Sequence, residues 1–315
     1  MNKDKFVILS DIHANLTALK AVLSDIQAQG YLPDAVVILG DIINYGMRPN
    51  EVISELEKLS YPIVVNLMGN HEKALLDGDL SHFSTERGKQ MLQYTSSILS
   101  ESSLLYIKEN MISTGLHAIE CQGKHLLFLH GSINDVFWGK LGPDAFSNIY
   151  YSNYDYVFSG HTHLPHNMSC FYPDECPRLR NKKKTVFINP GSVGQPRNQN
   201  PCAQYVYFEL STGKVHYNAV KYDVEAEYRL YPDFLDVFYK FKLDMKNLYV
   251  ISGVTGMTGN ELARQLLNDG HTVIGFDNFF ASSIDAVQDI VNNKNFLFYE
   301  YDLNNVEQMS EISRL

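Results

Sequence analysis

Phe6-Val7-Ile8-Leu9-Ser10-Asp11-Ile12-His13 is a short apolar run followed by an Asp-x-His pair. The apolar residues predict a strand buried in an α/β sheet. Such a parallel strand delivers the residues that follow it to the carboxyl edge of the sheet, where α/β proteins build their sites. Because one residue separates Asp11 from His13, the two side chains can direct an oxygen and a nitrogen toward the same point.

The same arrangement recurs at four later strand ends. Taken alone, an Asp-x-His pair is more often a helix cap beside a surface histidine than a ligand pair. Here, however, further apolar runs end in Gly40-Asp41, Gly69-Asn70-His71-Glu72, His130-Gly131 and Gly160-His161-Thr162-His163. Five strand ends that all carry metal-ligand side chains predict a metal centre.

Length and composition exclude several classes of protein. The chain has 315 residues, of which 45% are hydrophobic, so it can bury a large core. Its formal charge of −10 and its pI near 5.5 argue against bulk nucleic-acid binding, which needs a basic face. We find no apolar run long enough for a membrane span and no signal-peptide core. The four cysteines form no CxxC motif, so we expect reduced thiols and a cytoplasmic protein.

The first 70 residues alternate between strand and helix patterns. Asn15 is a predicted helix cap, and Gly30 ends the helical spacing that follows it. A second strand is predicted over 35–39, a second helix after a cap at Asn50, and a third strand over 63–67. This βαβαβ order predicts a parallel sheet covered by helices.

The middle of the chain changes character twice. Residues 73–110 are helical and polar, with Thr85 as a cap, and we expect them to form a lid or flank without chemistry of their own. A hairpin turning at Gln122-Gly123 follows. Further strands are predicted over 126–129, 156–159 and 186–188. Strands over 204–210 and 215–220 are expected to form a hairpin that closes the second sheet.

We expect three parts in this chain. The first domain covers residues 1–222, and a separate C-terminal segment covers 247–315. Between them, residues 223–246 predict an aromatic-rich helical connector. Its buried face would consist of Phe234, Leu235, Phe238 and Phe241.

The candidate ligands are two aspartates, one asparagine and four histidines. They are Asp11, Asp41, Asn70, His13, His130, His161 and His163. Carboxylates and imidazoles together suit Mn, Fe or Zn, and the absence of thiolates argues against a closed structural zinc site. Because the set exceeds what one tetrahedral ion needs, we expect two divalent ions bridged by an aspartate, about 3.5–4 Å apart.

The motif series resembles that of a known superfamily. D-x-H, G-D, G-N-H-[ED], H-G and G-H-T-H, in this order, resemble the calcineurin-like metallophosphoesterase superfamily. The longer patterns S-D-I-H-A-N-L-T-A-L, G-D-I-I-N-Y-G-x-x-P-N-E-V and N-P-G-S-V-G-Q-P-R resemble its YfcE-like branch. The resemblance covers residues 5–225 and implies an α/β fold, in which two sheets form a sandwich flanked by helices.

The resemblance also implies how the site residues divide. One metal ion would be bound by Asp11, His13 and His163. The other would be bound by Asn70, His130 and His161. Asp41 would bridge the two ions. His71 would bind neither and would act as the catalytic acid, while a metal-bridged hydroxide attacks phosphorus.

The resulting expectation is a dinuclear metal-dependent phosphoesterase for a small phosphate ester, preferably a phosphodiester of small or cyclic nucleotide type. A phosphomonoester, a phosphoprotein and a dinucleoside polyphosphate are alternative substrates. A hypothesis of another class is an NAD-sensing binding protein that uses the phosphoesterase fold as a platform.

For other residues near these motifs, the sequence gives less specific evidence of a role in the site. The remaining six histidines are expected to be structural, with His166 as the best exception because it follows His163 closely and could contact substrate. Asn189 and Ser192 are candidates for hydrogen bonds to ligands or phosphate. Arg197 is a candidate for phosphate binding or for a surface ion pair. Three lysines at 182–184 form either a solvated loop or a steering site for anions.

The C-terminal segment predicts the first half of a Rossmann fold, a βαβαβ unit. Gly253-x-x-Gly256-x-x-Gly259 lies between a strand and a helix, and Asp277 follows the next strand, before a second helix and a third strand. This pattern resembles extended short-chain dehydrogenases of the NAD-dependent epimerase/dehydratase type. The resemblance implies an NAD site at the three glycines and Asp277. Because the second half of that sheet and the Tyr-x-x-x-Lys pair are missing, we expect no redox catalysis but a possible homodimer contact.

Overall fold

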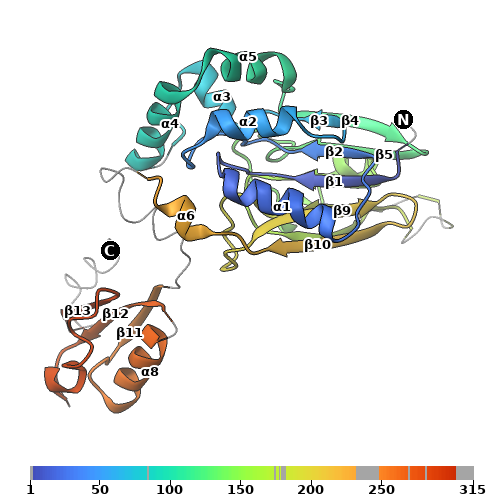
Figure 1. Ribbon diagram of the computed structural model, residues 1–315. Coiled ribbons are helices and arrows are strands. Elements are labelled where there is room, and N and C mark those ends of the chain that lie inside the picture. The colour runs from blue at the N-terminus through green and yellow to red at the C-terminus, as the bar shows by residue number, and fades with distance from the viewer. Residues whose placement is uncertain are drawn as a thin grey trace. The chain divides into compact units, whose positions relative to one another are not determined.

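A computed structural model describes residues 3–83, 85–173, 175–176, 178, 182–231, 248–268, 270–280 and 282–302. The chain forms two compact units, Met1–Asp244 and Met245–Leu315 (Figure 1). Of the expected connector, the structure describes only the first part, which contains the short helix α6 (Val224–Tyr228). The four residues of its expected buried face, three phenylalanines and one leucine, lie outside the described residues.

One five-stranded sheet carries the first three predicted strands. Its order is β10-β9-β1-β2-β3. β1 (Lys5–Leu9), β2 (Ala35–Ile38) and β3 (Ile63–Asn66) are parallel, as expected from the βαβαβ order. β9 (Ala203–Glu209) and β10 (Lys214–Val220) form the predicted hairpin, but its expected place in the second sheet is wrong, because β9 pairs with β1 in antiparallel fashion.

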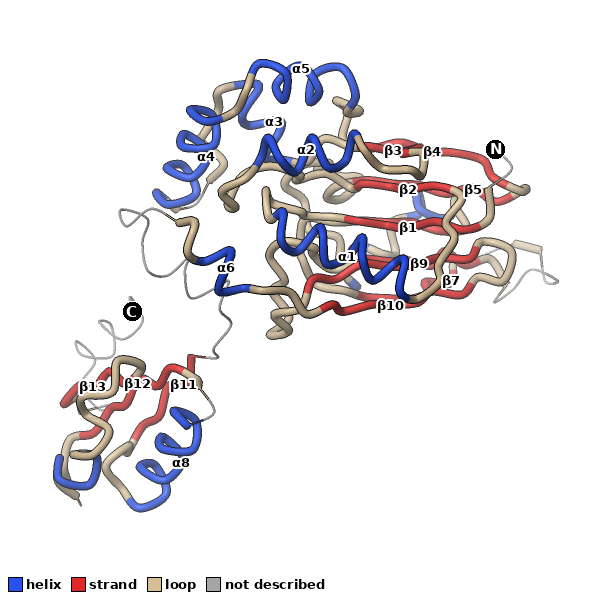
Figure 2. The backbone as a smooth tube through the Cα atoms, viewed as in Figure 1, coloured by secondary structure: helices blue, strands red, loops and turns tan. Residues whose placement is uncertain are grey.

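Helices that follow the strands cover one face of this sheet, as Figure 2 shows for α1 and α2. α1 (Leu16–Ala28) begins after Asn15, whose Oδ1 accepts a hydrogen bond from the N–H of Ala18 at 3.0 Å. Gly30 lies just past its end with φ +67°. Both predicted boundaries of this helix are confirmed.

The predicted cap of the second helix is wrong. α2 (Pro49–Glu57) begins at the proline, with Arg48 before it, and Asn50 is already helical. Proline is favoured there because its fixed φ suits the first helical turn and its missing N–H is not needed. The Asn50 amide instead donates to the Ile98 carbonyl and accepts from the N–H of Ser100.

Residues 73–110 are helical, as predicted. They contain most of α3 (Asn70–Asp77), all of α4 (Glu86–Ile98) and all of α5 (Glu101–Asn110). The hydroxyl of Thr85 caps α4 by accepting from the N–H of Gly88 at 3.2 Å. α3 begins at Asn70, so it starts at the predicted metal-binding edge.

The second five-stranded sheet has the order β4-β5-β6-β8-β7. β5, β6 and β8 are parallel, and β4 and β7 flank them in antiparallel fashion. The hairpin of β4 and β5 turns at Gln122-Gly123, as predicted. The strands are β4 (Leu116–Cys121), β5 (Lys124–Leu129), β6 (Tyr156–Ser159), β7 (His166–Phe171) and β8 (Lys184–Asn189), with 3-10 turns at Pro143–Ala145 and Ile149–Asn153.

Alternate residues of β1 serve two different cores. Val7 and Leu9 pack against the helices on one side. Phe6 and Ile8 face the other way and pack with residues of the second sheet such as Phe128. Because successive side chains of a strand point to opposite faces, a strand buried on both faces must be apolar throughout. The two-sheet sandwich flanked by helices is therefore confirmed.

The lysine loop does not leave from the metal-binding edge. β7 runs away from that edge, and β8 runs back, since His166 pairs with Asn189 and Phe171 pairs with Lys184. Residues 182–184 therefore lie at the far end of six-residue strands, about 20 Å from Asn189 at 3.3 Å per residue. This distance from the metal-binding edge argues against the steering site for anions and favours the solvated loop.

The C-terminal unit has a parallel sheet of order β11-β12-β13. Its strands are β11 (Leu248–Ser252), β12 (Thr272–Asp277) and β13 (Phe296–Glu300), and α8 (Met257–Asn268) connects the first two. The helix expected after Asp277 is replaced, among the described residues, by a four-residue 3-10 turn, Ile284–Val287. In neither unit do the described residues form a helix whose length and hydropathy would suit a membrane span.

Candidate metal centre

The carboxyl ends of five parallel strands bring the candidate ligands to one edge of the sandwich. The ligands follow β1 (Asp11, His13), β2 (Asp41), β3 (Asn70), β5 (His130) and β6 (His161, His163). Six of the seven are no more than 2% exposed, and only His161 is partly exposed. The candidate ligands are thus shielded from solvent at one edge of the sandwich.

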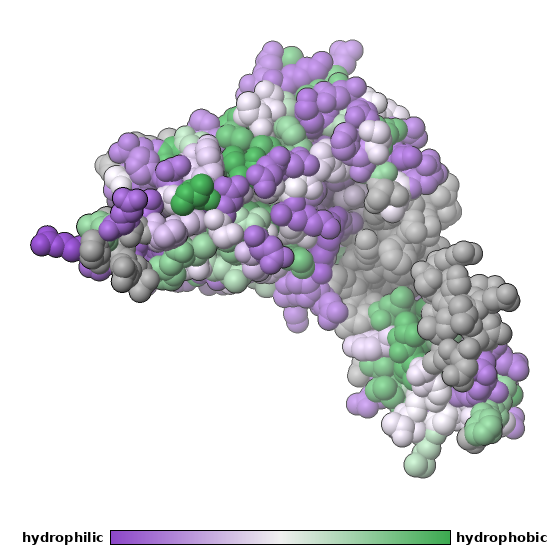
Figure 3. All heavy atoms as spheres, turned by 180° about the vertical axis from the view of Figure 1, so that it is seen from behind, coloured by the Kyte–Doolittle hydropathy of each residue, from purple (hydrophilic) through white to green (hydrophobic). Residues whose placement is uncertain are grey.

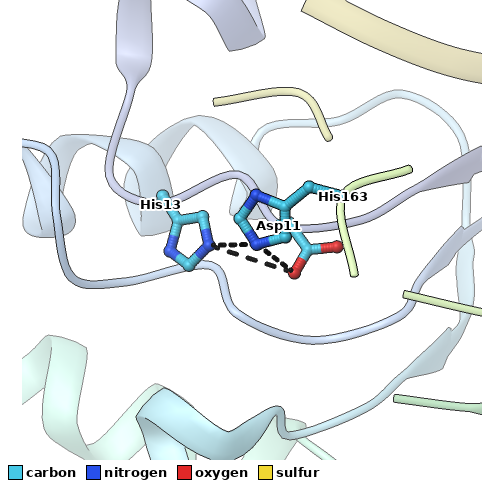
Figure 4. Close-up of side chains that lie close together, drawn as sticks. All are labelled: Asp11, His13 and His163. Carbon is cyan, nitrogen blue, oxygen red and sulfur yellow. Dashed lines mark hydrogen bonds and ion pairs between the residues drawn. The ribbon is translucent and has the colours of Figure 1, made fainter. Parts of the chain in front are cut away.

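The first group consists of Asp11, His13 and His163 (Figure 4). His163 Nε2 lies 3.2 Å from Asp11 Oδ1, and the Nε2 atoms of His13 and His163 lie 3.2 Å apart. Asp11 Oδ1 is buried and accepts no hydrogen bond within the described part of the chain. A buried carboxylate oxygen without a donor is costly, so this arrangement fits a cation between the three side chains.

The second group contains Asp41, His130 and His161. The Oδ1 atom of Asn70 lies 2.9 Å from His130 Nε2 and 3.0 Å from His161 Nδ1, and thus joins this group. Asp41 Oδ2 lies 3.3 Å from His130 Nε2. Oxygen and imidazole nitrogen again converge on one point.

Asp41 lies between the two groups. Its Oδ2 atom is 3.3 Å from His130 Nε2 and 4.0 Å from His13 Nε2, so one carboxylate is near histidines of both groups. It also lies 3.8 Å from His71 Nε2, and His13, Asp41 and His71 form a third possible ligand group. The geometry alone thus leaves His71 beside the ligands.

Three histidines are oriented from behind by backbone carbonyls. Nδ1 of His13 lies 3.2 Å from the Ile43 oxygen, and Nδ1 of His130 lies 2.8 Å from the Leu39 oxygen. Nδ1 of His163 lies 2.5 Å from the oxygen of Gln195. A carbonyl only accepts, so each Nδ1 carries a proton and each Nε2 faces the centre, where it is the nitrogen that can bind a metal ion.

The backbone at the strand ends adopts an uncommon conformation. Asp11, His13, Asp41, His161 and His163 all have φ between 48° and 60°, in the left-handed region. Non-glycine residues rarely adopt this conformation, and such residues cluster at functional sites because the surrounding structure must hold them there.

The charges of the site suit a cation. Burial opposes ionisation of the Asp11 carboxyl, but the adjacent His163 ring lowers its pKa below the ordinary value. Burial also opposes charge on His130, yet the Asp41 carboxylate raises the pKa of His130 to about 9. Burial and the neighbouring His163 hold the pKa of His13 well below its ordinary value. The carboxylates therefore remain ionised, and positive charge is favoured beside them.

Glu72 has a supporting role that the sequence analysis missed, although the G-N-H-[ED] motif contains it. Its buried carboxylate accepts four backbone N–H bonds of 2.8–3.1 Å, from Asp41, Ile42, Ile43 and Gly69. It thereby joins the ends of β2 and β3. A Cβ at Gly69 would lie 2.1 Å from Asp41 Oδ1, so glycine is required there. Burial raises the pKa of Glu72 to about 7.

Aromatic rings pack against the side chain of His71. The Tyr45 ring lies 4.7 Å from it and the Phe83 ring 5.2 Å. Its Nδ1 lies 2.5 Å from Asn44 Nδ2. Burial lowers the pKa of His71 to about 4, so the ring is neutral near pH 7. Asn44 was missed although the G-D-I-I-N-Y-G pattern contains it, and Phe83 was missed because nothing in its local sequence marks it.

Of the other candidate residues, some form hydrogen bonds that hold the loops of the metal centre, and one lies apart from the ligands. Asn189 Nδ2 donates to the Gly160 oxygen, and Ser192 Oγ donates to the backbone oxygen of Asp11. His166 belongs to none of the three possible ligand groups found among the described residues. His166 is instead the first residue of β7. The backbone N–H of Arg197 donates to the His163 oxygen at 3.4 Å, which places this residue beside the centre.

The glycine motif of the C-terminal unit forms a tight turn. Gly253 has φ +68°, and a Cβ at Gly259 would lie 2.3 Å from the Gly253 oxygen. Asp277 at the end of β12 accepts from the N–H groups of Thr255 and Phe279 at 3.0 and 2.9 Å. The structure thus brings these four predicted residues to the same end of β11 and β12, and NAD binding itself stays a prediction.

Comparison with known proteins identifies the family of the first unit. The chain is 31% identical over 240 residues to the uncharacterized protein MJ0912 of Methanocaldococcus jannaschii, which is 72% of this chain and 92% of that protein. It resembles the crystal structure of a metallophosphoesterase from Sphaerobacter thermophilus with a TM-score of 0.57, 27% identity, and coverage of 78% and 99% of the two chains. The hypothetical protein PH1004 from Pyrococcus horikoshii OT3 shares the fold, with a TM-score of 0.58, 20% identity, and coverage of 75% and 97%.

The family assignment covers the metal centre and not the C-terminal unit. The domain model of the calcineurin-like phosphoesterase superfamily matches residues 5–213, which include all seven candidate ligands and His71. Placement in the YfcE-like branch and the Rossmann-like assignment of the C-terminal unit stay predictions. The chain belongs to the calcineurin-like phosphoesterase superfamily.

Proposed function

We propose that this protein is a dinuclear metal-dependent phosphoesterase that hydrolyses a small phosphodiester, such as a cyclic nucleotide. The position of Asp41 supports this best, because its carboxylate lies between two groups of ligand atoms. We assign Asp11, His13 and His163 to one ion and Asn70, His130 and His161 to the other. Mn, Fe and Zn all suit these oxygen and nitrogen donors.

The residues of the chain then have distinct tasks. When bound, the two ions supply an activated water and neutralise the phosphoryl oxygens. His71 acts as the catalytic acid in its protonated form, and its neutral ring presents Nε2–H toward the centre and stabilises the departing oxygen through a hydrogen bond. Arg197 lies at the exposed side of the centre and adds positive charge for the phosphate.

An assay of the manganese-loaded protein against a panel of phosphomonoesters and phosphodiesters tests this proposal. We expect diesters to be hydrolysed and preferred. Preference for a phosphomonoester, a phosphoprotein or a dinucleoside polyphosphate would retain the enzyme class and change the substrate. Inactivity of the fully metal-loaded protein toward every ester would contradict the proposal.

The variant His71→Ala tests the role of the acid. It should retain its metal ions and lose about 10²–10⁴-fold in kcat, which is the usual contribution of a general acid. The loss should shrink for esters whose leaving group needs little protonation. Loss of metal, with no dependence on the leaving group, would instead make His71 a ligand.

A second activity, NAD binding by the C-terminal unit, is favoured by the position of Asp277. Burial opposes its charge, but hydrogen bonds from Thr255 lower the pKa of this carboxyl, so an ionised acid lies beside the glycine turn. Such an acid binds the ribose hydroxyls of NAD and disfavours NADP. Calorimetric titration with both dinucleotides should show binding of NAD alone, and Asp277→Ala should abolish it. No heat with NAD at millimolar concentration would leave this unit without a dinucleotide role.

A further inference from the structure

A row of three aromatic residues, Tyr45, Phe83 and Trp138, runs along one side of the metal centre. The rings of Tyr45 and Phe83 contact His71 at 4.7 and 5.2 Å. The Trp138 ring lies 5.3 Å from Phe83 and 6.4 Å from His161, nearly perpendicular to both. The row therefore extends from the proposed acid to the one ligand that is partly exposed.

The loop that carries Trp138 is tightly built and begins at a ligand. Trp138 is eight residues after His130, and the backbone N–H of Trp138 donates a hydrogen bond to Asp135 Oδ1 at 3.0 Å. The N–H of Gly139 donates to the Asp135 oxygen, also at 3.0 Å. A Cβ at Gly139 would lie 2.2 Å from the Ser132 hydroxyl, so the turn accepts only glycine there without a shift. Trp138 is thus fixed relative to the metal centre.

Trp138 offers a surface that a planar group can use. The indole is only partly buried, and the exposed ring of His82 stacks on it at 5.1 Å and 14°. Among the described residues, the indole N–H donates to no protein acceptor. Tryptophan near a site usually combines apolar contact with a hydrogen bond from its N–H. A nucleobase has both a flat face and acceptor atoms.

We propose that Trp138, supported by Phe83, binds the planar aromatic group of the ester, so that the enzyme prefers nucleotide esters over alkyl esters. The base takes the place over the indole that His82 occupies in this structure. This inference rests on the proposed function, because it names the organic part of the same substrate. Base–aromatic stacking contributes about 5- to 150-fold in affinity per ring.

A binding experiment tests the contact without catalysis. Trp138 is the only tryptophan of the chain, so the intrinsic fluorescence of the protein reports on it alone. Titration with adenosine monophosphate should change this fluorescence in a saturable way, and glycerol phosphate at the same concentrations should not. Free tryptophan titrated in parallel corrects for absorption by the nucleotide. An equal response to both phosphates, or none to either, would overturn the inference.

Three variants separate stacking from a general effect on the fold. Trp138→Leu keeps an apolar side chain and should lower kcat/KM for an adenosine diester about 5- to 150-fold, with little change for a glycerol diester. Trp138→Phe keeps a ring and should retain most of the preference. Phe171→Ala removes an aromatic that is 54% exposed at the far end of β7, and serves as the matched control.

The two proposals fail in different ways. If the metal-loaded protein hydrolyses both diesters equally and Trp138→Leu changes neither, the stacking inference is wrong and the phosphoesterase proposal stands. If no ester is hydrolysed but adenosine monophosphate still changes the fluorescence, the contact is real and the proposed reaction is wrong. His82→Ala should leave nucleotide binding intact or strengthen it, and a loss comparable to that of Trp138→Leu would contradict the position given to the base.

Discussion

The amide nitrogen of Asn44, Nδ2, lies 2.5 Å from Nδ1 of His71. An amide NH₂ group only donates, so Nδ1 is the acceptor and the proton of the neutral ring is on Nε2. The hydroxyl of Thr95 lies 3.3 Å from Asn44 Oδ1 and donates to it, which is consistent with this orientation of the amide. Asn44 therefore determines that His71 presents an N–H, and not a lone pair, toward Asp41 and the metal centre.

Replacing Asn44 with leucine should lower turnover without removing metal. The variant no longer fixes the proton of His71 on Nε2, so we expect kcat to fall about 10-fold or more, but less than after removal of the acid itself. Elemental analysis and steady-state kinetics check both statements. Asn50→Ala is the matched control, because the Asn50 amide forms its hydrogen bonds with the backbone of Ile98 and Ser100. If Asn44→Leu loses metal instead, His71 is a ligand whose orientation depends on Asn44.

Replacing Asp41 with asparagine should remove both metal ions. Asp41 Oδ2 lies near histidines of both groups, and a neutral amide is a poor bridge between two cations. Asp11→Asn affects one group only and should reduce the metal content by one ion. Elemental analysis after gel filtration distinguishes the two outcomes. Two ions retained in Asp41→Asn would show that Asp41 does not bridge.

The predictable part of this structure follows from strand ends. Asp11 and Asp41 are separated by 30 positions but lie together, because parallel strands of one sheet end at the same edge. The same rule holds within the second sheet for the parallel strands that end before His130 and His161, so the residues were found from apolar runs. The sheet that each run belongs to was only partly predicted, because the strands over 204–210 and 215–220 were expected in the second sheet and lie beside β1 in the first.

The less predictable part depends on where loops pack. Trp138 and His161 come from different loops, and no periodicity relates them. Phe83 precedes α4 and contacts His71 only because α3 and α4 pack together. The helix cap was predicted at Asn50 and lies two positions earlier, at Arg48. The error arose because Asn and Pro both favour helix starts and the chain contains Pro49 next to Asn50.

Metal affinity should increase with pH between about 6.5 and 9. In the metal-free protein Asp41 raises the pKa of His130 from 6.5 to about 9, despite burial. A raised histidine pKa stabilises the fold fully below 6.5, and this contribution is lost as pH rises through 9. The melting temperature of the metal-free protein should therefore fall across this range, while a metal ion competes with fewer protons.

The control for this pH dependence is His130→Asn, which removes the titrating ring. The metal-free variant should show a flatter melting curve against pH over the same range. Metal titrations of the original protein at several pH values measure the second effect. A metal affinity that does not change between pH 6.5 and 9 would show that His130 does not hold the proton.

Replacing Glu72 with glutamine should weaken both the fold and the metal centre. Each carboxylate oxygen of Glu72 accepts two backbone N–H bonds. In glutamine an NH₂ group replaces one of these oxygens, so two backbone N–H groups would face another donor and lose their acceptor. Each unpaired buried N–H costs about 1–3 kcal/mol. We expect a lower melting temperature and metal affinity reduced about 10- to 100-fold, as for other residues that orient ligands. Glu57→Gln, at an exposed position of α2, should change neither.

Deleting residues 245–315 should leave the phosphoesterase activity largely intact and reduce self-association. The C-terminal unit has apolar side chains gathered on the face shown in Figure 3. Val250, Ile274 and Leu297 form one row across its sheet, in which Ile274 is buried and the flanking Val250 and Leu297 are 60% and 49% exposed. A parallel sheet normally has both faces covered, and a unit of this size has a small core, so we expect a second copy to cover this row.

The truncation must keep α6. Glu227 in that helix is fully buried and forms an ion pair with Arg48, which follows the loop containing Asn44, so a shorter chain would disturb the metal centre. Light scattering of the full and truncated chains should give a dimer and a monomer. Leu297→Asp in the full chain should have the effect of the deletion, because a charge cannot be buried in the contact. If both chains are monomers, the row is covered by something other than a second copy. If activity disappears while metal is retained, the C-terminal unit takes part in the reaction.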